Sequence, residues 1–96
     1  MYYKNEFPNY DYEIPSLGNG WIDSSWHNDV CPSFEYTSNQ GVIYRLWFEY
    51  NDPDIREVGG KQFTLSKYSD YDEMVQLLES DDLSEVLNYF NNLKKV

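Results

Sequence analysis

The sequence has a single cysteine, Cys31, few basic residues and no long apolar run. A lone cysteine cannot close an internal disulfide, which favours a reducing compartment. No stretch approaches 18 consecutive apolar residues, so we expect no membrane span. Residues 1–6 lack the basic and apolar regions of a signal peptide. We therefore expect a protein that works in the cytoplasm of a host cell.

Basic residues are scarce along the chain. Seven Lys and Arg oppose 17 Asp and Glu, which gives a formal net charge of −10. No base lies between Lys4 and Arg45, and none lies between Lys67 and Lys94. A protein with this charge repels nucleic acid and anionic membranes, because it has no cations with which to displace the counterions of phosphates. We predict no direct binding to nucleic acid and none to membranes.

Aromatic side chains are abundant, with ten Tyr, five Phe and three Trp among the 96 residues. Each buried ring removes a large area from water, so a chain of this length can form one hydrophobic core without a metal or disulfides. No internal repeat or low-complexity linker divides the sequence. We therefore predict a single domain over residues 1–96.

Residues 20–68 have the alternating pattern of β-strands. The clearest strand is Val42–Tyr50, whose core face we predict to carry Val42, Tyr44, Leu46, Phe48 and Tyr50. Weaker patterns predict strands over 21–26, 33–37, 55–58 and 62–67, the last with Phe63 and Leu65 pointing inward. Residues 1–19 are rich in Tyr, Asn and Pro, and we predict an extended arm with a short edge strand at 10–14.

Residues 69–94 have the pattern of two helices. Asp70 precedes Glu73 by three residues, as Asp82 precedes Glu85, and both pairs match a capping box. Two apolar stripes at helical spacing follow these caps: Tyr71, Met74, Val75 and Leu78, then Leu83, Val86, Leu87 and Phe90. The predicted fold is α+β, an antiparallel β-meander of about four strands followed by two C-terminal helices packed on one face. Its predicted core joins Leu46, Phe48, Val75, Leu78, Leu87 and Phe90.

Two kinds of chemistry are conceivable at His27 and Cys31. Zinc needs four ligands, or three and a water, and the sequence holds no second His or Cys. A Cys–His nucleophile needs a context that lowers the thiol pKa, whereas Pro32 and a predicted strand follow Cys31. We predict no metal, no cofactor and no catalytic residue. A hydrolase that uses His27 and Cys31 is the most distant of three functional hypotheses.

The carboxylates form clusters that have two interpretations. They are a solvated coat, because helix N-termini favour acids and charge aids solubility. Alternatively, they bind a basic partner, which agrees with the near absence of balancing Lys. The candidate partner-binding residues are Glu49, Asp52, Asp54, Glu57, Asp70, Asp72, Glu73, Asp81 and Asp82.

The chain resembles small acidic phage and mobile-element proteins of the anti-CRISPR type. The resemblance is one of character over the whole chain, in segments such as 20–34 (GWIDSSWHNDVCPSF), Asn51-Asp52-Pro53 and Arg56-Glu57. It implies a non-enzymatic inhibitor that blocks the basic nucleic-acid-binding surface of a host protein or complex, for example a CRISPR effector. The alternative is a structural or assembly module that dimerises through a sheet edge, so the chain is either a monomer or a homodimer. An inhibitor of this kind should gather its acids on one continuous face.

Overall fold

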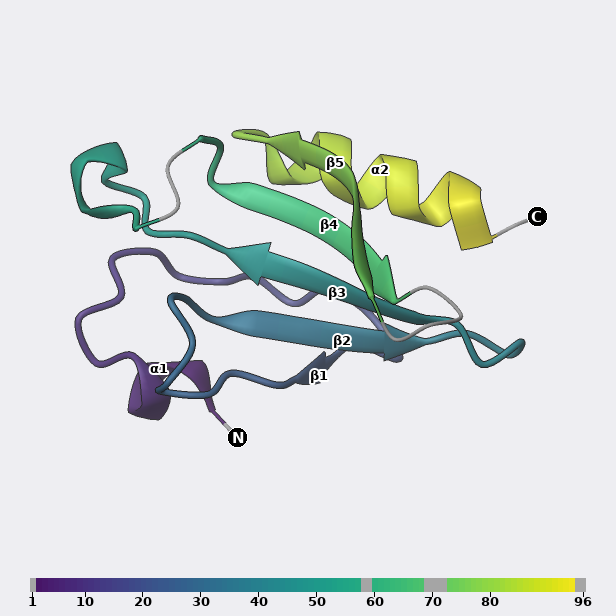
Figure 1. The fold of residues 1–96 in the computed structure, drawn as a ribbon, viewed down its shortest axis with the longest axis horizontal. Helices are drawn as coiled ribbons and strands as arrows, with labels where there is room; N and C mark the ends of the chain where they lie inside the picture. The colour runs from purple at the N-terminus through teal and green to yellow at the C-terminus, as the bar shows by residue number, and fades with distance from the viewer. Residues whose placement is uncertain (1, 58–59, 69–72, 95–96) are drawn as a thin grey trace.

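A single antiparallel sheet of five strands forms the centre of the computed structural model, which describes residues 2–57, 60–68 and 73–94 (Figure 1). The strands are β1 (Ile22–Asp23), β2 (Ser33–Thr37), β3 (Ile43–Phe48), β4 (Phe63–Tyr68) and β5 (Met74–Ser80). Each strand pairs with the next one in sequence, so the sheet is a meander with β1 and β5 at its edges. Helix α2 (Leu83–Lys94) follows β5 and packs against β4 and β5.

The hydrophobic core lies between the sheet and α2. Its most buried members, each at most 2% exposed, are Leu46 and Phe48 of β3, Phe63 and Leu65 of β4, and Val86 and Phe90 of α2. Side chains alternate between the faces of a strand, and this places the four strand residues on one side. The predicted core face of the third strand is therefore confirmed at Leu46 and Phe48. The inward positions predicted for residues 62–67, Phe63 and Leu65, are confirmed as well.

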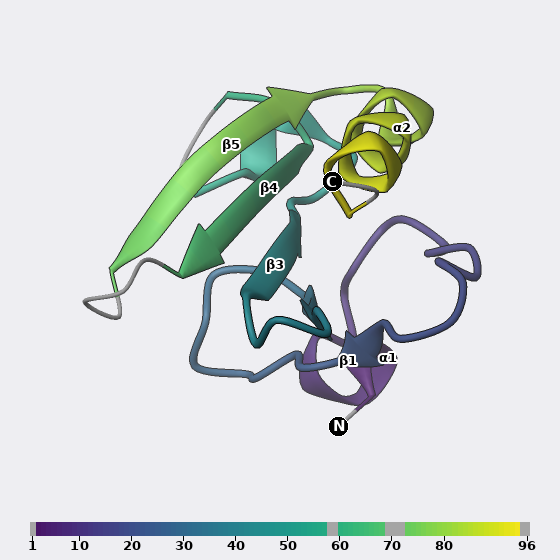
Figure 2. The same cartoon turned by 90° about the vertical axis from the view of Figure 1, so that its right-hand side faces the viewer.

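The N-terminal segment completes the cover of this face. After the short helix α1 (Tyr3–Glu6), residues 7–21 run on the same side of the sheet as α2 (Figure 2). The aromatic and aliphatic residues that pack against the core from this segment are Tyr10, Tyr12, Ile14, Leu17 and Trp21. The predicted edge strand at 10–14 is wrong, because these residues form no strand. The side chains of Tyr10, Tyr12 and Ile14 pack against the core instead, and β1 occupies that edge of the sheet.

The first of the two helices predicted within residues 69–94 is also wrong, since Met74–Ser80 forms β5, while residues 69–72 lie outside the described part of the chain. Leu78 pairs with Leu65 and Gln76 pairs with Ser66, so a bulge separates the two pairs at Leu77. The bulge allows the adjacent Leu77 and Leu78 both to pack against the core. The helical spacing of Met74, Val75 and Leu78 therefore does not correspond to a helix face. The sheet thus has five strands and is followed by one C-terminal helix. Val75 is 41% exposed and does not join the predicted core.

Local hydrogen bonds change two of the weaker strands. β1 is shorter than the predicted 21–26, because the Asp23 carboxylate accepts a hydrogen bond from the Ser25 amide and ends the ladder. The predicted strand at 55–58 is not formed over 55–57, because Ile55 ends the 3₁₀-helix η1 (Pro53–Ile55) and the next two residues are irregular, while residue 58 lies outside the described residues. Asp52 caps η1 by accepting a hydrogen bond from the Asp54 amide at 2.9 Å.

The other strands and the C-terminal helix agree with the predictions made from the sequence. Strands at 33–37, 43–48 and 63–68 are confirmed to within one or two residues. Asp82 caps α2 as predicted, since its Oδ1 accepts a hydrogen bond from the Ser84 amide at 3.0 Å. The Asp82 amide, however, donates to Ser80 Oγ at 3.0 Å and not to the predicted capping-box partner Glu85. The other predicted cap, Asp70, lies outside the described residues. Within the described part of the chain, no helix is both long and apolar enough to cross a bilayer.

Candidate partner-binding site

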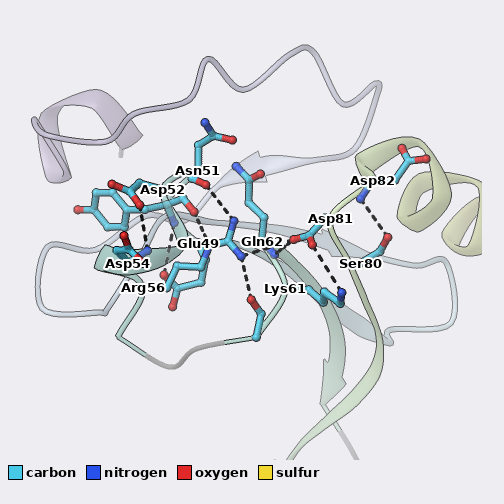
Figure 3. A network of polar contacts seen from close by, with 12 residues as sticks. Glu49, Asn51, Asp52, Asp54, Arg56, Lys61, Gln62, Ser80, Asp81 and Asp82 are labelled. Atoms are coloured by element: carbon cyan, nitrogen blue, oxygen red, sulfur yellow. Dashed lines mark hydrogen bonds and ion pairs between the residues drawn. The ribbon is translucent and has the colours of Figure 1, made fainter.

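Three segments that are distant in sequence meet at one end of the sheet. The Asp11 carboxylate accepts hydrogen bonds from the amides of Asn51 and Asp52, at 2.7 and 2.9 Å. Asp81, between β5 and α2, accepts a hydrogen bond from the Gln62 amide at 2.8 Å (Figure 3). We call this region the acidic end, and its exposed carboxylates are Asp11, Asp52, Asp54, Glu57, Glu79, Asp81 and Asp82.

Arg56 joins these segments from below the surface. Its side chain is 7% exposed and donates to three carbonyl oxygens, those of Tyr50 (2.6 Å), Gly60 (2.8 Å) and Asn51 (3.1 Å). Its Nη1 also lies 3.5 Å from Asp81 Oδ1 (Figure 3). A fork of guanidinium donors can satisfy several carbonyls at once, which fixes the turn of the β3–β4 loop.

The cations at the acidic end are associated with a single carboxylate. Asp81 contacts Arg56, and its Oδ2 lies 3.6 Å from Lys61 Nζ. The hydrogen bond from the Gln62 amide, aided by the charges of Lys61 and Arg56, lowers the pKa of Asp81. Among the described residues, no ion pair neutralises the exposed acids of this end other than Asp81. Most of its negative charge is therefore available to a partner.

The predicted binding residues divide into groups in the structure. Asp52, Asp54, Glu57, Asp81 and Asp82 are exposed and lie together at the acidic end. Glu73 precedes β5 at the opposite end of that strand, about 20 Å away for a strand of this length. Asp70 and Asp72 lie outside the described residues.

Glu49 lies beneath the acidic end, where it is only 6% exposed. Its Oε2 accepts a long hydrogen bond from the Tyr50 amide at 3.4 Å. No donor in the described part of the chain reaches its Oε1. An approaching partner thus meets the exposed acids before it meets Glu49.

Sequence reasoning missed Asp11 and Glu79 as members of this end and Arg56 as its organiser. Asp11 lies in an irregular segment whose position depends on packing, so no local signal indicates its role. Arg56 had a usable signal, since it is one of two arginines and lies in a loop rich in acids. A charged fork in such a loop has carbonyls and carboxylates within reach.

His27 and Cys31 have different environments. Cys31 is buried, and burial together with the nearby Glu49 charge raises the pKa of its thiol, so the protonated form is favoured. His27 is exposed, its ring lies tilted against the Trp26 ring, and its Nδ1 lies 3.0 Å from Glu6 Oε1. The His27 contact lowers the pKa of Glu6. Within the described ranges, no group of three His, Cys, Asp or Glu is placed to hold a metal ion.

Comparisons of the chain with protein-family models, curated proteins and solved structures found no match. The charge and geometry of the acidic end are therefore the features that indicate its function.

Proposed function

We propose that the chain is a non-enzymatic inhibitor of the anti-CRISPR or anti-defence type, which binds the basic nucleic-acid-binding surface of a host protein or complex. The observation that carries this proposal is the convergence of seven exposed carboxylates at one end of the sheet. They come from the N-terminal segment, the β3–β4 loop and the β5–α2 region. Complementary charge steers such a surface toward grooves lined with Lys and Arg.

The charge at this end is smaller than that of a nucleic acid of the same size. The molecule is 26 Å across on its second principal axis, and duplex DNA carries about 15 phosphates over that length. Seven carboxylates less the two cations Arg56 and Lys61 leave five negative charges, about a third as many. Charge alone therefore gives steering, and tight binding requires desolvated contacts as well. The exposed Ile55, within η1, supplies an apolar anchor among the acids.

Binding kinetics with the purified partner test this proposal. Tagged protein first captures the partner from host lysate, and association is then measured at low and physiological salt with competing duplex DNA. The double variant Asp54→Asn with Glu57→Gln removes two charges without removing a cap or an ion pair. We expect association to slow about three- to tenfold at low salt, and DNA to compete.

A matched control changes the net charge equally at the opposite end of the molecule. Asn91→Lys with Asn92→Lys adds two positive charges near the C-terminal end of α2, far from η1 (Figure 1). We expect less than about a twofold change in the association rate. Equal effects of the two variants would contradict a role for the acidic end. Binding that is indifferent to salt and to DNA would contradict the inhibitor proposal itself.

The alternative function, a structural module that dimerises through a sheet edge, has one favourable observation. β5 is an edge strand, and Met74 and Val75 are exposed on it. The bulge in β5 opposes this function, because bulges disfavour pairing with a further strand. Sedimentation equilibrium at micromolar concentration decides between the two. A dimer that Val75→Lys dissociates would support the module, and a monomer would exclude it.

A further inference from the structure

A cavity of about 380 Å³ lies on the face of the sheet that α2 leaves open. Its floor includes Trp47 of β3 and Thr64 of β4, which alternate with core residues and therefore point to the second face. Met74 of β5 and Val30 of the loop before β2 form opposite walls. Helix α2 and residues 7–21 lie on the other side of the sheet and contribute no lining residue (Figure 2).

Glu49 lines this cavity and brings a negative charge to it. Its Oε1 is buried and receives no hydrogen bond from the described residues, while its Oε2 has only the long contact with the Tyr50 amide. A buried carboxylate oxygen without a donor is destabilising. The carboxylate therefore loses little by turning toward a donor that enters the cavity.

The same face already holds one cation in a similar setting. Along β3, Arg45, Trp47 and Glu49 succeed one another on the second face. The Arg45 guanidinium pairs with Glu35 and lies 5.2 Å from the centroid of the Trp47 ring. It also lies 5.9 Å from the centroid of the Tyr68 ring. Aromatic rings beside a carboxylate thus bind a guanidinium here.

The Glu49 side of Trp47 has the carboxylate and apolar walls but no bound cation among the described residues. Glu79 adds a second negative charge to the cavity wall. Lys61 also lines the cavity, but its ammonium group is directed to Asp81 at 3.6 Å. The charge of this cavity favours a cation.

We propose that the cavity binds an organic cation, an ammonium or guanidinium group carried on an apolar stem. The charged group contacts Glu49, and the stem lies against Trp47 and Met74. Lys and Arg side chains of a basic partner have this chemistry, and so do free alkylamines. The first source rests on the proposed function, whereas the second does not.

Nuclear magnetic resonance of the protein alone tests the site. The probes are butylammonium and butylguanidinium, with butanol as a neutral analogue of the same stem. We expect saturable shifts at the Trp47 indole N–H and its neighbours for the two cations. Glu49→Gln should weaken binding at least about tenfold. Asp54→Asn, an exposed carboxylate outside the cavity, should weaken it less than about twofold. Equal binding of butanol, or equal effects of the two variants, would overturn the proposal.

A second variant keeps the test valid if Glu49→Gln does not fold. Gln76 is exposed and lines the cavity, so Gln76→Lys places a tethered ammonium group there. Butylammonium should then no longer bind, and unchanged affinity would overturn the proposal. A Gly/Ser peptide with one Lys that displaces butylammonium identifies side chains as the source, and binding of the free amine alone identifies alkylamines. No partner is needed, so failure here is distinct from failure of the proposed function.

Discussion

Arg56 has a role that its neighbours in the β3–β4 loop do not share. Its nearly buried guanidinium satisfies three carbonyl oxygens of that loop and contacts Asp81 across from it. Asp81 is largely exposed, so the ion pair itself adds little stability. The hydrogen bonds to the carbonyls are the larger contribution, because charged donors form the stronger bonds.

Replacing Arg56 by Met should therefore lower the free energy of unfolding by about 2–4 kcal/mol, since three carbonyls lose their donor. Lys61→Met is the matched control, because Lys61 contacts the same carboxylate from an exposed position. It should change the free energy of unfolding by less than about 0.5 kcal/mol. Urea denaturation of both variants measures the difference. Equal losses would show that the ion pair, and not the carbonyl network, stabilises the loop.

Because of the Cys31 thiol, we expect the free energy of unfolding to fall as the pH rises into the alkaline range. Burial raises its pKa in the folded protein, so the folded state keeps the proton while the unfolded chain releases it above pH about 8.5. This contribution to stability is complete below that pH and is lost as pH rises, at most about 1.4 kcal/mol per pH unit.

Denaturation at pH about 8.5 and about 9.5 should show this slope, and Cys31→Ala should flatten it. Tyr10 and Tyr50 also have raised pKa values through burial, but tyrosines begin to titrate only near pH 10 in the unfolded chain. The comparison concerns slopes, because the alanine also removes buried volume. An equal slope in both proteins would assign the pH dependence to another group.

At the scale of elements, two aspartates begin helical segments and also belong to the acidic end. Asp52 caps η1, and Asp82 caps α2. Helix N-termini favour carboxylates through both the free amides and the helix dipole. Some of the charge that we propose for partner binding therefore has a structural role as well.

Asp82→Ala should lower the free energy of unfolding by about 1 kcal/mol, because the Ser84 amide loses its acceptor. Asp54→Ala removes an equal charge from the same end, where only its backbone amide takes part in the cap of η1. That variant should stay within about 0.5 kcal/mol of the parent protein. Thermal unfolding of the two variants separates capping from charge. A similar loss in both would mean that Asp82 does not act as a cap.

At the scale of the whole molecule, the charge is unevenly distributed. Seven exposed carboxylates share the acidic end, and both of its cations contact Asp81. Like charges at this spacing repel one another in the folded state more than in an expanded chain. The clustering of carboxylates that supports the proposed function thus also lowers the free energy of unfolding at low salt.

Raising NaCl from about 20 mM to about 300 mM should increase the free energy of unfolding by roughly 1 kcal/mol, through screening of this repulsion. The variant Asp54→Asn with Glu57→Gln should gain less from salt than Asn91→Lys with Asn92→Lys. Both change the net charge by two, so only position differs. If the two gains are equal, the repulsion is spread over the molecule and is not concentrated at the acidic end.

The sequence by itself determined the features that depend on local periodicity and local capping. Alternation identified the core faces of β3 and β4, because successive side chains of a strand point to opposite faces. The spacing after Asp82 identified the start of α2, because a cap acts on amides within the next three residues. The same alternation places Glu49 on the face of the sheet opposite to Leu46 and Phe48.

Only the tertiary structure decided the features that depend on contacts between distant segments. Met74, Val75 and Leu78 have a helical spacing, yet the open edge of β4 makes that segment a strand, and a bulge lets the adjacent Leu77 and Leu78 both reach the core. Asp11 joins the β3–β4 loop because packing of residues 7–21 brings it there. Burial of Glu49 arises from neighbours across the sheet that its own sequence position does not indicate. Each of these outcomes depends on which segments share the core, and no local pattern records that.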